Sequence, residues 1–325
     1  MSHRRPCVFA KRLNWVIVAI ALLASVGCGS RHTVPQGAPV DKDLERSNRA
    51  ARTAFENGRI QQAAGLYRQS LAQAYLRDDL AAAVDAKYNL AVCLTLLESD
   101  PEALSLVVQA REELLRADQS VPGDILLLEA TVRYRLGQLQ EAWQLTENIL
   151  QATDPIPAAV TSKTRFLRGL IAYDRGDSPK LKEEIAALAG STSAVIVADR
   201  QELIGHLALS ERGWDEAIRV FDEVAAIRRE TLDYRGMVKA LAKAGEACER
   251  AGRGAAASRR YLRAGQSTAL QGNLDQAQIW LARAVQLADQ VGDETLAQEA
   301  RLQLTQLQKK QPAMSGDHAS GKEGP

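Results

Sequence analysis

Cysteine and histidine are the side chains best suited to nucleophilic or metal chemistry, and the sequence holds four of each. They are Cys7, Cys28, Cys93 and Cys248, and His3, His32, His206 and His318. They do not assemble into the four-ligand spacings of a zinc site or into a Cys-x-x-Cys redox motif. The sequence therefore predicts no metal centre and no thiol-based active site.

Paired carboxylates could serve as a general acid and base. The adjacent pairs are Glu112-Glu113 and Glu183-Glu184. Neighbours on a helix do not face one another, so we expect both pairs to lie on solvated surfaces. The sequence also lacks a glycine-rich phosphate loop and a nucleophile elbow. We therefore expect a protein that is not an enzyme and that holds no cofactor.

The charge distribution argues against nucleic-acid binding. The formal net charge is +1, but the first 27 residues carry four basic residues and no acidic one. Without those four, 37 Lys and Arg face 40 Asp and Glu, a net of −3. The basic character belongs to the N-terminal segment, and the body has no bulk attraction to nucleic acid.

The N-terminal segment has the pattern of a signal peptide. Residues 1–12 are basic, and residues 13–27 form an apolar run. A membrane-spanning helix needs about 20 apolar residues, so this run is short for a permanent span. The alternative is a true span that anchors a cytoplasmic regulator, and the presence or absence of residues 1–27 in the mature protein separates the two.

The end of that run, Ser25-Val26-Gly27-Cys28, resembles the lipobox of bacterial lipoproteins. The resemblance implies removal of residues 1–27 and acylation of Cys28, with residues 28–40 as a flexible linker. Ser25 departs from the usual Leu, so an ordinary signal peptide remains the alternative. In a Gram-negative cell, Gly29 after the cysteine implies the outer membrane, facing the periplasm.

Residues 41–308 read as a series of helical hairpins. In six of them a small residue of the first helix is followed 12 positions later by a residue of the second. The pairs are Ala51/Ala63, Ala91/Ala103, Ala130/Ala142, Gly169/Leu181, Gly205/Ala217 and Gly245/Ala257. Close helix crossings need contact points without bulk, so each pair predicts a crossing.

Large apolar residues four positions later, as in Ala217-x3-Phe221 and Ala257-x3-Tyr261, resemble the tetratricopeptide repeat (TPR). The resemblance implies an all-α, right-handed α-solenoid of about seven hairpins, with periods of 36–40 rather than 34. HEAT-like repeats are the structural alternative. Residues 273–308 are expected to form a capping hairpin that is out of register with the six pairs, and residues 309–325 a disordered tail.

The repeat register places Cys93 and Cys248 four layers apart. Helix layers are spaced by about 8–10 Å, whereas a disulfide needs Cα atoms within about 7 Å. We therefore expect two small buried side chains without a disulfide between them.

In the TPR family the first helices of successive hairpins line a concave groove that binds peptides. Carried over by register, this implies a peptide- or partner-binding groove of mixed aromatic, amide and charged side chains. Its expected residues are Arg49, Arg52, Tyr88, Asn89, Thr131, Tyr134, Arg135, Phe166, Tyr173, Glu202, His206, Lys239, Lys243 and Glu246.

The sequence thus predicts a membrane-anchored TPR scaffold or adaptor lipoprotein. Its partners would be other cell-envelope proteins bound in the groove, and the membrane through the lipid at Cys28. Nucleic acid and small-molecule substrates are not expected. The alternative is an accessory or regulatory subunit of an envelope enzyme or assembly machine, such as a secretin or pilus, outer-membrane insertion or a peptidoglycan hydrolase.

Overall fold

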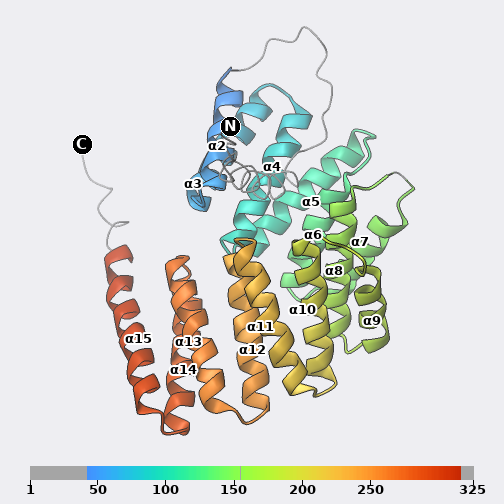
Figure 1. The fold of residues 1–325 in the computed structure, drawn as a ribbon. Coiled ribbons are helices and arrows are strands. Elements are labelled where there is room, and N and C mark those ends of the chain that lie inside the picture. The colour runs from blue at the N-terminus through green and yellow to red at the C-terminus, as the bar shows by residue number, and fades with distance from the viewer. Residues whose placement is uncertain (1–41, 154, 316–325) are drawn as a thin grey trace, which may run out of the picture. The chain divides into compact units, whose positions relative to one another are not determined.

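A computed structural model describes residues 42–153 and 155–315, which form fourteen α-helices and no strand (Figure 1). The helices are α2 (Lys42–Glu56), α3 (Ile60–Leu76), α4 (Leu80–Leu96), α5 (Asp100–Arg116), α6 (Gly123–Arg135), α7 (Leu139–Gln151), α8 (Ala158–Asp174), α9 (Ser178–Ala187), α10 (Ala194–Ser210), α11 (Trp214–Glu230), α12 (Tyr234–Arg250), α13 (Gly254–Leu270), α14 (Leu274–Gln290) and α15 (Glu294–Ser315). The prediction of an all-α repeat fold is confirmed.

The chain forms two compact units, and the boundary between them along the chain falls within α8. The N-terminal unit comprises residues 1–171 and the C-terminal unit residues 172–325. Within each unit, helices that follow one another along the chain pack as antiparallel neighbours, as α10 to α15 show in Figure 1. Each unit therefore has a core of its own, and the helix faces of each are described separately below.

A regular spacing of helix starts organises the C-terminal unit. Helices α10 to α15 begin at residues 194, 214, 234, 254, 274 and 294, a step of 20 residues. Those from α10 to α14 have 17 residues each, about 25 Å of helix. The last hairpin, α14 and α15, therefore keeps the register, contrary to the sequence-based expectation. The expectation failed because Val285 stands where the earlier hairpins have Ala or Gly.

The turns explain how this step is repeated. A residue in the left-handed conformation follows each of the helices α10 to α14, as Gly252 does after α12 with φ 72°. The amide of Arg253 then donates to the carbonyl of Cys248 at 2.8 Å, which closes the helix end. In the turn before α11 the left-handed residue is Arg212, with φ 60°, and not Gly213, which precedes the helix with φ −77°.

The crossing pairs lie where the spacing predicts. Every member of the six pairs is buried. In the five hairpins that fall within one unit, the two helices pack directly on each other. A Cβ atom added to Gly205 would stand 2.8 Å from Cζ of Phe221, so that contact leaves no room for a methyl group. The local 12-residue spacing therefore identified true helix contacts.

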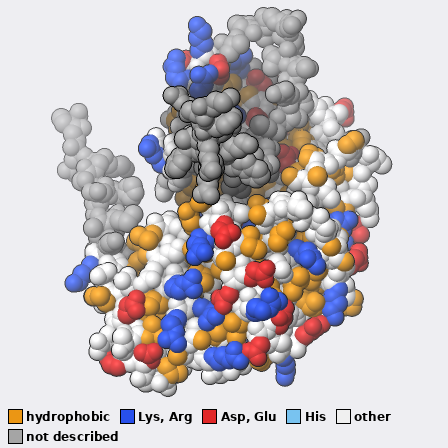
Figure 2. Space-filling model, in the orientation of Figure 1, with side chains coloured by type: hydrophobic (Ala, Val, Ile, Leu, Met, Phe, Trp, Pro, Cys, Tyr) orange, Lys and Arg blue, Asp and Glu red, His pale blue; other side chains and the backbone are white. Residues whose placement is uncertain are grey.

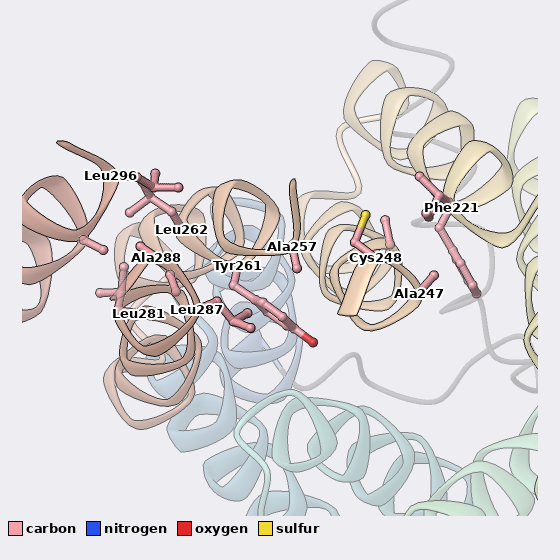
Figure 3. Packing of buried hydrophobic residues seen from close by; sticks show 14 of the residues in the cluster. Phe221, Ala247, Cys248, Ala257, Tyr261, Leu262, Leu281, Leu287, Ala288 and Leu296 are labelled. Atoms are coloured by element: carbon pink, nitrogen blue, oxygen red, sulfur yellow. The ribbon is translucent and has the colours of Figure 1, made fainter. Parts of the chain in front are cut away.

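Small side chains also set the packing deeper in the C-terminal unit. Figure 3 shows Ala247, Cys248 and Ala257 between the rings of Phe221 and Tyr261. All five residues belong to one buried cluster. The thiols of Cys93 and Cys248 are free and buried, and burial raises the pKa of Cys93 to about 12.

The ends of the chain differ from the expected boundaries at one point. Helix α15 extends to Ser315, so the segment after residue 308 begins as helix. The expected signal segment, Cys28, the expected linker and residues 316–325 lie outside the described residues. In the part of the chain that is described, no helix is long and apolar enough to cross a membrane.

Candidate peptide-binding face

In the C-terminal unit, α10 and α12 bring the expected groove residues together in two groups. Glu202 of α10 lies within electrostatic reach of Lys239 of α12. One turn further along α10, His206 lies within reach of Lys243 and Glu246. The residues were assigned from register alone, so their proximity supports the assignment of α10 and α12 as neighbouring first helices.

The accessible part of this face is charged. Lys239 is exposed. Lys243 Nζ lies 3.0 Å from Glu246 Oε2, and Arg250 Nη2 lies 3.0 Å from Glu246 Oε1. Such partly exposed pairs are weakly held and can exchange partners with a bound peptide at little cost.

His206 is buried rather than groove-lining. Its ring centroid lies 4.4 Å from that of Tyr173 and 5.3 Å from that of Phe221, edge-on to the latter. Only 6% of the residue is exposed. Burial lowers the pKa of His206 to about 3, with Lys243 acting in the same direction. The imidazole is therefore neutral at pH 7 and acts as an aromatic packing group beside the half-buried Tyr173.

In the N-terminal unit the expected groove residues are engaged locally. Arg49 pairs with Glu45 of its own helix at 2.6 Å, and Arg52 is exposed. The Asn89 side-chain amide donates to the carbonyl of Asp85 at 2.9 Å. These polar groups lie on first helices, and none of them is buried.

Tyr88 does not expose its ring, contrary to the expectation. It is 7% exposed and belongs to the buried cluster around α3 to α6. Burial raises the pKa of its hydroxyl, and Asp124 and Asp85 act in the same direction. The sequence misled here because α4 is covered by α3, α5 and α6 and buries most of its circumference.

The remaining expected groove residues lie on α6 and α8, the first helices of the third and fourth hairpins. Thr131 donates its hydroxyl hydrogen to the carbonyl of Leu127 at 2.7 Å, and Tyr134 packs, half-buried, on the cluster of α6 to α8. Arg135 Nε donates to both carboxylate oxygens of Asp100, at 2.8 and 3.0 Å. Phe166 is half-buried, with Lys163 Nζ at 5.8 Å from its ring centroid.

One buried ion network in the C-terminal unit was not foreseen. Arg228 of α11 is 7% exposed and reaches three carboxylates. Its guanidinium nitrogens lie 2.6 Å from Asp199, 2.9 Å from Glu202 and 3.0 Å from Asp233. Asp199 is fully enclosed, and Asp233 also caps the start of α12 by accepting from the amide of Gly236. The network, which includes Glu202, therefore fixes α10, α11 and α12 to one another.

The N-terminal unit has its own buried charges. Glu129 of α6 lies 2.8 Å from both Arg111 and Arg133, and Lys87 of α4 lies 2.5 Å from Glu113. A charged residue at a helical position between apolar ones, such as Lys87 three residues from both Val84 and Leu90, is the signal that could have found these sites.

The two carboxylate pairs also differ from the expectation of solvated faces. Glu113 is half-buried because it pairs with Lys87. Glu184 is buried because it lies, with Leu181 and Leu188, on the inward face of α9. Among the described residues, no group of His, Cys, Asp and Glu could hold a metal ion.

The charges visible in Figure 2 are intermixed, with Lys and Arg beside Asp and Glu and hydrophobic atoms between them.

No protein-family model matches the sequence, and no curated protein matches it. Solved structures do resemble the fold. The apo form of the quorum sensor NprR from B. thuringiensis is 14% identical, with 86% of this chain and 84% of that chain covered and a TM-score of 0.53.

The apo form of RapI is 11% identical over 82% of this chain and 77% of that chain, with a TM-score of 0.51. A tetratricopeptide repeat protein from Parabacteroides merdae is 13% identical, with 80% and 100% covered and a TM-score of 0.46. At these identities the first two likenesses establish the fold, a repeat array of helical hairpins, and leave the function to be argued from the helix faces.

Proposed function

We propose that this protein is a non-catalytic scaffold that binds other proteins along the first helices of its hairpins. The observation that carries the proposal is the grouping of Glu202, Lys239, Lys243 and Glu246 on α10 and α12. The buried Arg228 network, which includes Glu202, holds the helices in place, while Lys239, Lys243 and Glu246 reach solvent.

We further propose that the scaffold is a membrane-anchored lipoprotein of the cell envelope, tethered through Cys28 and serving envelope proteins as its partners. The support is the short apolar run that ends in Val26-Gly27-Cys28 and the linker composition that follows. An accessory subunit of an envelope enzyme or assembly machine remains the second form of this proposal, with the same face in use.

Site-specific photocrosslinking in cells tests the binding face. A photoreactive amino acid at Lys239, which is exposed on α12, should give a discrete crosslinked product. The matched control is Lys182, an exposed lysine of α9, which is a second helix. Products from Lys182 alone, or equal products from both positions, would place recognition elsewhere on the surface.

Metabolic labelling tests the anchor. A clickable fatty acid should label the wild-type protein and leave the Cys28→Ala variant unlabelled, because the thiol is the acyl acceptor. The control is Cys93→Ala, which removes a buried thiol and should not change the labelling. Equal labelling of wild type and Cys28→Ala would end the lipoprotein proposal and leave the binding face untouched.

A further inference from the structure

A second surface of the C-terminal unit has the chemistry of a binding site. A hollow of about 320 Å³ opens between α11, α12 and α13. Its charged lining consists of one acid, Asp222, and four arginines, Arg229, Arg259, Arg260 and Arg263. The excess of positive charge in one hollow is the starting point of the inference.

Two of these arginines are already engaged. Arg260 forms a double contact with Asp222, at 2.5 Å and 3.1 Å, and this bond joins α13 to α11. Arg259 stands at 3.9 Å from Asp293, the residue that caps α15. The pair of Arg260 with Asp222 is neutral and structural, so it does not account for the positive excess.

The other two arginines keep their binding capacity. Arg229 and Arg263 are exposed, and within the described part of the chain neither makes an ion pair or a side-chain hydrogen bond. A guanidinium offers five N–H donors in a planar fork that matches a carboxylate. Two such groups at one hollow form a binding site for anionic groups.

The floor of the hollow is apolar. Met237 and Leu241 of α12, which stand one turn apart, line it together with Ala225 and Ala226 of α11. A bare inorganic anion gains nothing from such a floor, because apolar surface solvates charge poorly. A peptide that carries aliphatic and acidic side chains together would use both the floor and the arginines.

The hollow is distinct from the proposed peptide-binding face. Met237 and Leu241 each stand two residues before Lys239 and Lys243 on α12. Two residues turn an α-helix by about 200°. The hollow therefore opens on the side of α12 opposite to the proposed groove.

The arginine spacing suits an extended segment. Arg259 is held only loosely, at 3.9 Å from Asp293, and its side chain is 61% exposed, so it can also turn to a ligand. It stands four residues from Arg263 on α13, a rise of about 6 Å. Alternate side chains of an extended peptide are separated by about 6.6 Å on one face. Acidic residues two positions apart can therefore meet both guanidinium groups while the residue between them faces the floor.

We propose that this hollow binds a short extended segment of a partner protein in which acidic and aliphatic residues alternate. This goes beyond the proposed function, because it assigns a second surface and a partner chemistry that the first-helix face does not share. An experiment can disprove the proposal for one surface and leave the proposal for the other intact.

Fluorescence anisotropy on the full-length protein tests the proposal. The probe is a fluorescein-labelled peptide of alternating glutamate and leucine, blocked at both ends. It should bind saturably, and Arg229→Gln/Arg263→Gln should weaken it about tenfold or more. Arg219→Gln/Arg301→Gln removes the same charge from exposed positions outside the hollow and should change the affinity by less than about threefold.

Two further measurements separate this site from plain charge attraction. Met237→Glu should also weaken the probe, because it places a carboxylate on the floor, and circular dichroism should show intact helices. A peptide with glutamine in place of glutamate should not bind. Absent binding by the wild type, equal loss in the two double variants, or equal competition by inorganic phosphate would overturn the proposal.

Discussion

Each compact unit holds one ion network, and the two networks have centres of opposite charge. The N-terminal network is centred on a buried acid, Glu129, which two arginines share. The C-terminal network is centred on a buried base, Arg228, which three carboxylates surround. One network carries an excess of positive charge and the other an excess of negative charge.

The difference lies in which groups can reach water. Arg111 and Arg133 are 27% and 21% exposed, and their long stems let the guanidinium groups rehydrate. Asp199 is 1% exposed and has a short side chain, so it cannot turn to water when its ion pair with Arg228 is lost. The C-terminal network should therefore be the more fragile of the two.

The largest expected effect is that of Arg228→Met. It removes the guanidinium that lies 2.6 Å from the buried Asp199, and loss of one member of a buried ion pair costs about 3–5 kcal/mol of unfolding free energy. Urea denaturation measures the change. The adjacent Arg229→Met is the control, because Arg229 is exposed and should stay within about 0.5 kcal/mol of wild type. Equal losses in the two variants would show that Asp199 is solvated by other means.

Glu129→Gln weakens the ion network of the N-terminal unit, in which Glu129 pairs with Arg111 and Arg133. We expect a loss of about 2 kcal/mol, because the charge-assisted hydrogen bonds weaken but both arginines can turn to solvent. Hydrogen exchange should show the change in α5 and α6, which Glu129 joins through Arg111. The exposed Glu112→Gln serves as the control. A loss larger than that of Arg228→Met would reverse the comparison.

Mild acid should lower the stability of the C-terminal unit and leave that of the N-terminal unit unchanged. His206 is the one histidine among residues 42–153 and 155–315. Its pKa is about 3 when folded and about 6.5 when unfolded. Between these values the unfolded chain binds the proton and the folded chain does not, so stability falls as pH falls below about 6.5.

The loss should reach about 2 kcal/mol between pH 6.5 and 5. Hydrogen exchange should place it in α10 and α11 and leave α3 to α5 unaffected. His206→Phe should remove the pH dependence in this window, since the ring contacts remain and the titrating group is gone. A slope that persists in this variant would assign it to another group.

The smallest effects come from one glycine in each unit. Gly65→Ala in α3 should stabilise by about 0.5–1 kcal/mol, because nothing lies within 4 Å of the new methyl group and alanine favours helix. Gly205→Ala in α10 should destabilise by about 1 kcal/mol, because the methyl group meets the fully buried ring of Phe221. Thermal melts of both variants check the opposite signs.

Local spacing made the hairpins predictable. The 12-residue distance in Gly205/Ala217 and Gly245/Ala257 is set by two helix segments and one turn, all within a single stretch of chain. The 20-residue step of the helix starts is equally local, but the sequence did not predict it. The left-handed residue of the turn is Gly252 in one place and Leu232 in another, and only glycine is a recognisable sequence signal for that conformation.

The candidate face was partly predictable. Register placed Glu202, Lys239, Lys243 and Glu246 on neighbouring helices, where the structure has them. It could not show that Tyr88 and His206 are buried, because that depends on how many helices cover α4 and α10.

The sequence by itself determined the helices, their pairing and the small residues at their crossings, because these depend on contacts close along the chain. The tertiary structure decided which charged side chains turn inward. Arg228 and Arg229 are identical neighbours in sequence, yet one lies among three carboxylates and the other on an exposed rim. Asp199 lies 29 residues from Arg228, and only the packing of α10 against α11 brings it there.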